Sequence, residues 1–267
     1  MPQYSGVFLI HIMKTGGNSV GRLLQDEFGS DVIYPPHDSE HLWNKMDLQR
    51  CLNIGSSRRR EIAFYSMHLP SWVAAHIAPA HLATTMLREP LSRTVSHLRH
   101  ISRSLPDTPA LDELYERQEY GRRLRNYQTR MFSSLPRHAH SEHLIARDQR
   151  QRAGEDPVFA QELLTGLDTS PWSRTALSSN DPLDSDALRR AKRQLEKVDE
   201  IGVTDDLDGL LVRISRHFTF ELHRAARLNS ATDSLSVPRS LKRRLESDLL
   251  LDLELYEYAK LLIRDRK

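Results

Sequence analysis

The residues from Lys14 to Ser19 combine a cation, two glycines and two hydroxyl groups within six positions. They follow the apolar run 7–12 (VFLIHI) and precede a helical pattern that stops at Gly29. Glycines let the backbone turn tightly and point several N–H groups inward, and a helix N-terminus adds partial positive charge. The segment predicts a site for a phosphate-like anion, with an ordinary glycine turn as the alternative. Its candidate anion-binding residues are Lys14, Thr15, Gly16, Gly17, Asn18 and Ser19.

The loop differs from the Walker A consensus, G-x-x-x-x-G-K-[ST], which cradles nucleoside triphosphates. Lys14 precedes the glycines, and no glycine stands upstream of it at the consensus spacing. These differences disfavour an ATPase or a kinase, although a small-molecule kinase stays open as an alternative. A non-catalytic nucleotide-binding module is a further alternative, which no residue pattern positively supports.

A second candidate anion site begins where the apolar run 82–87 (LATTML) gives way to Arg88. Pro90 suits the first turn of a helix, and Ser96 stands about two turns into that helix. Arginine suits phosphate because its planar fork binds two oxygens at once. Since ligands in open α/β sheets bind beyond the carboxyl ends of strands, we expect Arg88 and Ser96 to hold a second anion. An exposed arginine at a strand end is the simpler alternative.

Short apolar runs alternate with helical patterns along most of the chain. Strands are expected at 7–12, 62–67, 82–87 and 201–204, with helices after the first, third and fourth and a long one over 239–264. This alternation predicts an α/β domain with a parallel sheet. The segment 104–197 is rich in Arg, Gln, Ser, Asp and Pro and is expected to add helices and loops over one sheet edge. A length of 267 residues suits one domain spanning 1–267.

Composition and charge exclude several classes of function. Lys plus Arg number 38 and Asp plus Glu 36, so a net charge of +2 gives no overall basic field for nucleic acid. The single cysteine, Cys51, excludes a disulfide framework and a cysteine-rich zinc site. The histidines His138, His140 and His143 are expected in a solvated loop and not at a metal. No membrane span is expected, and with no leader pattern at the N-terminus the expected location is cytoplasmic.

Two segments, HIMKTGGNS (11–19) and LREPLSRTVSHL (87–98), resemble the phosphate-binding segments of sulfotransferases that use 3′-phosphoadenosine 5′-phosphosulfate (PAPS). The similarity is to the branch related to heparan sulfate 2-O- and 6-O-sulfotransferases and its bacterial relatives. Further segments resemble that branch in the same order: YSMHLP (65–70), NYQTR (126–130), and IGVT with LELYEYA (201–204 and 253–259). The chain departs from the usual pattern at Met13, where proline is common, at Asn18, where threonine is frequent, and at Asp205, where glutamate is frequent.

The resemblance implies a sheet of P-loop-like topology, flanking helices and an inserted, mostly helical acceptor region at about 104–197. It implies that PAPS binds and that its sulfuryl group passes to a hydroxyl acceptor, a carbohydrate or another metabolite, leaving the 3′,5′-bisphosphate PAP. Lys14 would contact the sulfonate and the leaving oxygen, the loop up to Ser19 would hold the 5′-phosphate, and Arg88 with Ser96 would hold the 3′-phosphate. Residues 137–180 match no segment of the branch, so the acceptor and the oligomeric state stay open.

His68 stands at the end of the apolar run 62–67. The sulfotransferase branch that this chain resembles carries a histidine base at the corresponding place. An imidazole, with an ordinary pKa near ~6.5, suits proton removal at neutral pH. We expect His68 to take the proton from the acceptor hydroxyl, with a strand-end histidine bonded to the backbone as the alternative. His11 is expected to be a packed, hydrogen-bonded residue, and the resemblance implies no metal.

Overall fold

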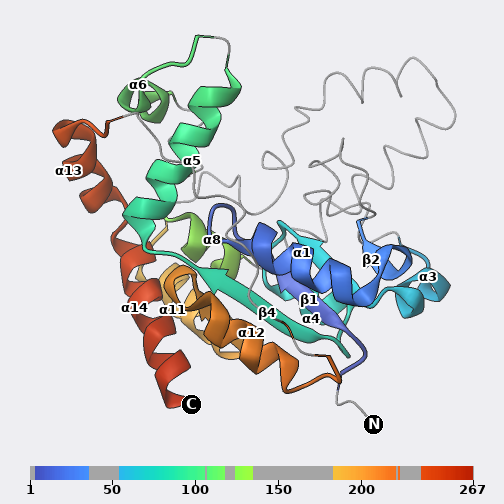
Figure 1. The fold of residues 1–267 in the computed structure, drawn as a ribbon. Helices are drawn as coiled ribbons and strands as arrows, with labels where there is room; N and C mark the ends of the chain where they lie inside the picture. The colour runs from blue at the N-terminus through green and yellow to red at the C-terminus, as the bar shows by residue number, and fades with distance from the viewer. Residues whose placement is uncertain are drawn as a thin grey trace, which may run out of the picture.

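The computed structural model describes residues 4–35, 54–105, 107–117, 124–134, 183–220, 222 and 236–266. Its centre is a sheet of five parallel strands in the order β2-β3-β1-β4-β5 (Figure 1). The central strand β1 pairs with β3 on one side and with β4 on the other, so that Val7 faces both Phe64 and Leu82. The expected α/β domain with a parallel sheet is confirmed. The strands are β1 (Val7–Ile10), β2 (Ile33–Tyr34), β3 (Phe64–Met67), β4 (Leu82–Leu87) and β5 (Glu200–Val203).

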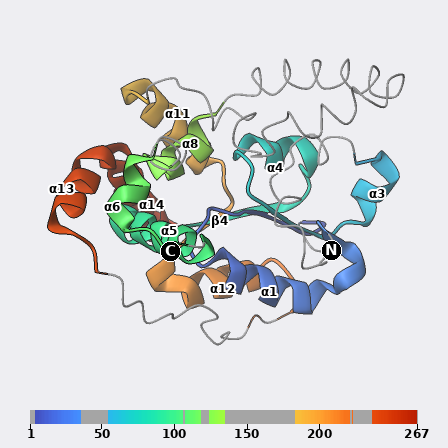
Figure 2. The same cartoon turned by 90° about the horizontal axis from the view of Figure 1, so that it is seen from above.

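Helices cover both faces of this sheet, as a parallel sheet requires because its strands are apolar on both sides. In Figure 2, α1 and α12 lie on one face, and α4, α8 and α11 lie on the other. The helices of the described residues are α1 (Gly17–Phe28), α3 (Ser56–Glu61), α4 (Trp72–Ile77), α5 (Pro90–Ser104), α6 (Leu111–Glu116), α8 (Tyr127–Ser133), α11 (Ser185–Glu196), α12 (Leu207–Ser215), α13 (Arg239–Asp248) and α14 (Leu250–Asp265), with 3-10 turns at Ser30–Val32 and Thr204–Asp206.

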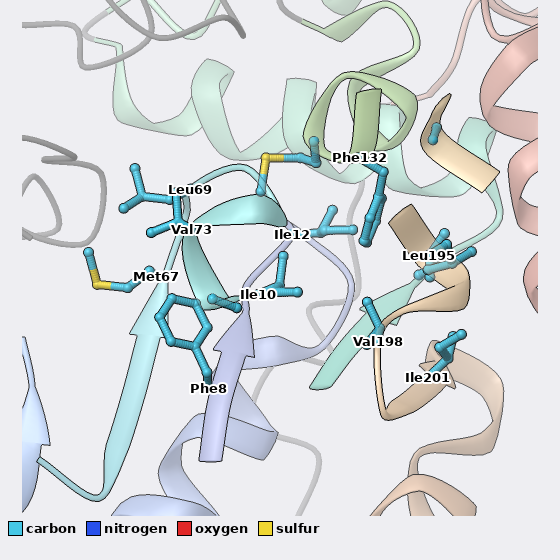
Figure 3. Packing of buried hydrophobic residues seen from close by; sticks show 14 of the residues in the cluster. Phe8, Ile10, Ile12, Met67, Leu69, Val73, Phe132, Leu195, Val198 and Ile201 are labelled. Carbon is cyan, nitrogen blue, oxygen red and sulfur yellow. The ribbon is translucent and has the colours of Figure 1, made fainter. Parts of the chain in front are cut away.

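The strand β1 contributes side chains to two apolar cores, one on each face of the sheet, because successive side chains of a strand point to opposite faces. Phe8 and Ile10 pack into a cluster with α4, α8, α11 and α14, whereas Val7 and Leu9 pack against α1 and α12. Figure 3 shows the first cluster, in which Ile10 and Ile12 lie between Met67 of β3 and Phe132 of α8. The central strand is therefore fixed from both sides, and its carboxyl end is a rigid starting point for the loop that follows it.

Helix α5 leads away from the end of β4 and builds a third apolar cluster with α6 and α13 (Figure 1). Leu98 of α5, Leu114 of α6 and Leu245 of α13 are fully buried in it. Pro90 is the first residue of α5, as the sequence predicts, and Gly29 ends α1 with φ 83°. The structure thus extends beyond the sheet on the side where the strands β1, β3 and β4 end.

The prediction of a single long helix over 239–264 is wrong, because the helix is interrupted at Leu249 and forms α13 and α14. Leu249 has φ −110° and ψ 17° and is buried with Leu245 in the third cluster. Leu255 of α14 packs instead into the core under the sheet. The apolar pattern is continuous in sequence but serves two different cores, and the chain must change direction between them.

The sequence patterns did not predict several short helices and strands. The strand β2 has two residues and the helices α3 and α4 have six each, which is too short for periodicity to show. Within the segment 104–197, the described parts form the helices α6, α8 and α11. Residues 135–182 lie outside the described residues.

Candidate functional site

The loop between β1 and α1 contains two residues in the left-handed region of backbone conformation. Lys14 has φ 68°, and Gly16, the N-cap residue of α1, has φ 93°. Glycine adopts this conformation at little cost. For lysine it is uncommon, and backbone strain of this kind clusters at functional sites. The loop therefore places the Lys14 backbone in a conformation that the surrounding fold must maintain.

Hydrogen bonds within this loop define where the ladder of α1 begins. The Ser19 N–H donates to the Gly16 carbonyl at 2.9 Å, so the N–H groups of the two preceding residues stand before the first bond of the helix. Thr15 is fully buried, and its hydroxyl donates to the Ile12 carbonyl at 2.8 Å. The Thr15 hydroxyl thus stabilises the loop itself. The other residues of the loop keep their place as candidate donors to an anion.

His11 packs directly against the start of α1. Its ring lies so close to Gly17 that a Cβ at that position would stand 2.3 Å from His11 Cδ2. The backbone N–H of His11 donates to the Met67 carbonyl at 2.8 Å, and the ring Nδ1 of His11 lies 3.5 Å from Ser66 Oγ. The expectation of a packed, hydrogen-bonded His11 is confirmed, and residue 17 must lack a side chain for the loop to close over the ring.

His68 follows β3 and is buried, with 4% of its surface exposed. Its Nδ1 lies 2.6 Å from the His11 carbonyl oxygen. A carbonyl only accepts hydrogen bonds, so Nδ1 carries the proton and donates it. The two imidazole rings are also adjacent, with centroids 4.1 Å apart. The backbone bond considered as the alternative is present, and it leaves Nε2 of a neutral His68 as the nitrogen that can accept a proton.

Arg88 follows β4 and joins the second predicted anion segment to the first. Its Nη1 donates to the Lys14 carbonyl oxygen at 3.2 Å. Its backbone is held by Gln128, whose Oε1 accepts from the Arg88 N–H at 3.0 Å and whose Nε2 donates to the Arg88 carbonyl at 2.9 Å. The two segments therefore touch through one hydrogen bond between residues that follow neighbouring strands.

Along the sequence, Lys14 and Arg88 are 74 positions apart, and the contact between them exists because β1 and β4 are neighbours in the sheet. Parallel neighbours end at the same edge, so the segments that follow them meet there. The two candidate anion segments are thus in contact at one edge of the sheet.

Glu89 caps the N-terminus of α5. Its carboxylate accepts hydrogen bonds from the N–H groups of Leu91 at 2.9 Å and Ser92 at 2.7 Å. Burial raises the pKa of Glu89, but these hydrogen bonds and the charge of Arg88 outweigh burial, and the pKa is lowered overall. An ionised Glu89 therefore occupies the N-terminus of α5, and the N-terminus of α1 is the helix end that an anion could use.

A single side chain ties together the loops that follow three strands. Thr204, directly after β5, places its hydroxyl 2.8 Å from the Thr15 carbonyl oxygen and 3.2 Å from the Leu87 carbonyl oxygen. The hydroxyl donates to these acceptors and bridges the ends of β1, β4 and β5. Sequence reasoning noted Thr204 only as part of a resembling segment and gave it no role.

His97, which the sequence patterns did not single out, lies on α5 near the same loops. Its Nδ1 is buried and has no hydrogen-bond partner within the part of the chain that the structure describes. Burial lowers the pKa of His97 well below its ordinary value, and the positive charges of Arg93, His100, Lys14 and His68 lower it further. No spacing rule marks this histidine, because the fold alone brings α5 next to the glycine loop.

The remaining predicted site residues occupy two helices. At the start of α1, Asn18 is exposed and Ser19 is buried. Ser96 is partly buried in the second turn of α5. The structure thus brings Arg88 into contact with the backbone of Lys14, and it places Ser96 on the helix that follows Arg88.

The sequence predicts neither a metal site nor a membrane-spanning helix. Among the described residues, no three side chains of the His, Cys, Asp or Glu types are grouped as metal ligands would be. His138, His140, His143 and Cys51 lie outside those residues. Within the described ranges, no helix combines the length and the apolar character needed to cross a membrane.

Comparison with protein-family models and with curated proteins finds no match to this chain. The features that bear on its function are therefore its own: the Lys14 loop, the Arg88 contact and the buried histidines at the ends of β1 and β3.

Proposed function

We propose that this chain is a sulfotransferase that moves a sulfuryl group from PAPS to the hydroxyl group of an acceptor. The observation that carries the proposal is the contact of Arg88 Nη1 with the Lys14 carbonyl oxygen at 3.2 Å. It joins two cationic residues and the N-terminus of α1 at the ends of adjacent parallel strands. A nucleotide with two separate anionic groups suits such an arrangement.

The electrostatics of the site also favour an anionic ligand. Burial lowers the pKa of both His97 and His100, and the positive charge of Lys14 lowers both further. Two histidines on α5 thus respond to the positive charge that Lys14 brings to this edge of the sheet. A bound phosphate or sulfonate would offset that charge, which supports the fit of a PAPS-like ligand.

The proposed roles of the cationic residues follow from where charge develops. PAPS supplies an activated sulfuryl group, and negative charge builds up on the sulfonate and on the leaving oxygen during transfer. Lys14 and the N–H groups at the start of α1 would stabilise that charge and hold the 5′-phosphate. Arg88, with Ser96, would hold the 3′-phosphate, whose charge is constant during the reaction.

His68 is the proposed base. Its Nδ1–H stays bonded to the His11 carbonyl oxygen, so Nε2 would take the proton of the acceptor hydroxyl. As that proton leaves, the hydroxyl oxygen bonds to sulfur, the bond between sulfur and the 5′-phosphate oxygen breaks, and PAP departs. The proposed acceptor is a hydroxyl compound, with carbohydrates as the first class to screen and a cytoplasmic location as part of the proposal.

Calorimetric titration with PAP, AMP, ADP and ATP tests this function before the acceptor is known. PAP is expected to bind roughly ten- to a hundredfold more tightly than AMP, because a charge-assisted phosphate contact contributes about 1.5–3 kcal/mol. Arg88→Ala should remove most of that preference. Arg216→Ala is the matched control, since Arg216 is exposed at the end of α12 and its loss changes the net charge equally.

Equal affinities for PAP and AMP would refute the second anion site and with it the sulfotransferase proposal. Tighter, magnesium-dependent binding of ATP would instead support a kinase. Strong PAP binding without turnover on any screened hydroxyl acceptor would favour a non-catalytic nucleotide-binding module.

A further inference from the structure

Gln128 is fully buried, and its side-chain amide binds the backbone of Arg88. Its amide pairs with both polar groups of the Arg88 backbone, at 3.0 Å and 2.9 Å, as a neighbouring strand would. Gln128 lies 40 positions from Arg88 in the sequence, in the first turn of α8. The backbone of the residue proposed to hold the 3′-phosphate is therefore fixed by α8.

The first turn of α8 is itself held by Asp252, a buried carboxylate on α14. Its Oδ1 accepts from the Thr129 N–H at 2.7 Å and its Oδ2 from the Gln128 N–H at 3.1 Å. In return, the N-cap residue Asn126 accepts the Asp252 N–H on its Oδ1 at 3.0 Å. This reciprocal exchange satisfies the helix N-terminus as a capping box does, but between two helices that are far apart in sequence.

The same turn of α8 also contacts helix α5. The Arg93 guanidinium lies over the Tyr127 ring, 4.9 Å from its centroid, and Arg93 is fully buried. Burial raises the pKa of the Tyr127 hydroxyl, and the charge of Arg93 acts in the opposite direction. Tyr127 thus contacts Arg93 of α5, and Gln128 contacts Arg88, which precedes that helix.

We propose that the first turn of α8, residues 126–129, is a positioning element for the segment that holds the 3′-phosphate, with Gln128 as the positioning residue for Arg88 and Asp252 as its anchor. The inference rests on the proposed function, because it concerns the 3′-phosphate site of that function. Figure 1 shows α8 beside the junction of β4 and α5, where such an element must lie.

The physical basis is the geometry that two hydrogen bonds impose together. One bond would let the Arg88 peptide rotate about it, whereas bonds to its N–H and its carbonyl fix the position and the direction of the backbone. The guanidinium at the end of a long side chain then has fewer arrangements available before the ligand binds. Preorganisation of this kind improves affinity for the group that is held, here the 3′-phosphate.

The test compares PAP with AMP on the full chain. Gln128→Glu keeps the size of the side chain and the acceptor for the Arg88 N–H, but it replaces the donor to the Arg88 carbonyl with a carboxylate oxygen. We expect the ratio of PAP to AMP affinity to fall at least fivefold, with AMP affinity within about twofold of the parent. Asp252→Asn should lower the same ratio, because an amide offers one acceptor where the parent offers two.

A control separates positioning from general stability. Ser102→Ala removes a buried hydroxyl that donates to the Pro109 carbonyl at 2.8 Å, near the far end of α5. It should lower the melting temperature without changing the ratio of affinities. If the parent prefers PAP and Gln128→Glu retains the full ratio, the positioning role is overturned. If the parent shows no preference for PAP, the proposed function fails first.

A measurement on the parent protein covers the case in which the variants do not fold. Coupling between two sites is reciprocal, so a 3′-phosphate that is held through Gln128 must in turn stabilise the contacts of Gln128. Amide hydrogen exchange at Arg88, Gln128 and Thr129 should therefore slow at least fivefold more at saturating PAP than at saturating AMP. Equal protection by both ligands would overturn the proposal.

Discussion

Replacing Gly17 with alanine tests the packing of the glycine loop on His11. The added Cβ would stand 2.3 Å from His11 Cδ2 and 2.5 Å from His11 Nε2. The His11 backbone is held on both sides, since its N–H donates to Met67 and its carbonyl accepts from His68. The substitution must therefore displace either the imidazole ring or the start of α1.

Two opposing effects set the size of the change. Alanine in place of glycine in a helix contributes about 0.5–1 kcal/mol of stability, mostly by restricting the unfolded chain. Forcing an extra methyl group into a packed site costs about 1–3 kcal/mol. The overlap at Gly17 is with a ring that has little room to move, so we expect the free energy of unfolding to fall by a net ~0.5–2 kcal/mol. For a chain of this length, each kcal/mol corresponds to roughly 2–4 °C in Tm.

Gly21 provides the matched control in the same helix. A Cβ there would lie 3.7 Å from Ser66 Oγ and 3.9 Å from Leu9 Cδ2, which is ordinary contact. Gly21→Ala should therefore stabilise the protein by about 0.5–1 kcal/mol in urea unfolding. Adding His11→Ala to Gly17→Ala should restore part of the loss, as a double-mutant cycle would show. If Gly17→Ala proved as stable as Gly21→Ala, the packing argument would be refuted.

Two further predictions concern the histidine on α5 and the bridge between the loops. Burial and nearby positive charges lower the pKa of His97 in the folded protein. As the pH falls, His97 of the unfolded chain therefore takes up a proton at a higher pH than His97 of the folded protein, and stability falls as pH drops below about 6.5. His97→Gln should make urea unfolding less dependent on pH between about 7 and 5, and an unchanged dependence would contradict this. Thr204→Val should lower the free energy of unfolding by ~1–3 kcal/mol, because the carbonyls of Thr15 and Leu87 lose their shared donor. A loss below ~0.5 kcal/mol would show that the bridge contributes little.

The sequence determined the elements whose signals are local. The boundaries of β4 match the apolar run 82–87, and α5 begins at Pro90, whose fixed backbone and missing N–H suit a first helical position. Gly29 ends α1 with a positive φ that glycine tolerates best. The glycine loop, Arg88 and His68 also stand where the strand ends were expected, because a strand end is visible in the residues that form it.

The tertiary structure alone decided the features that depend on distant partners. Leu249 interrupts a continuous helical pattern because the residues before and after it pack into different cores. The bonds from Gln128 to Arg88 and from Asp252 to the turn of α8 join residues 40 and 124 positions apart. Periodicity and capping rules describe neighbours along the chain, so they give no sign of a helix cap supplied by another helix. The order of the strands created the contact between Arg88 and Lys14, since β1 and β4 are adjacent and the segments that follow them meet at one edge of the sheet.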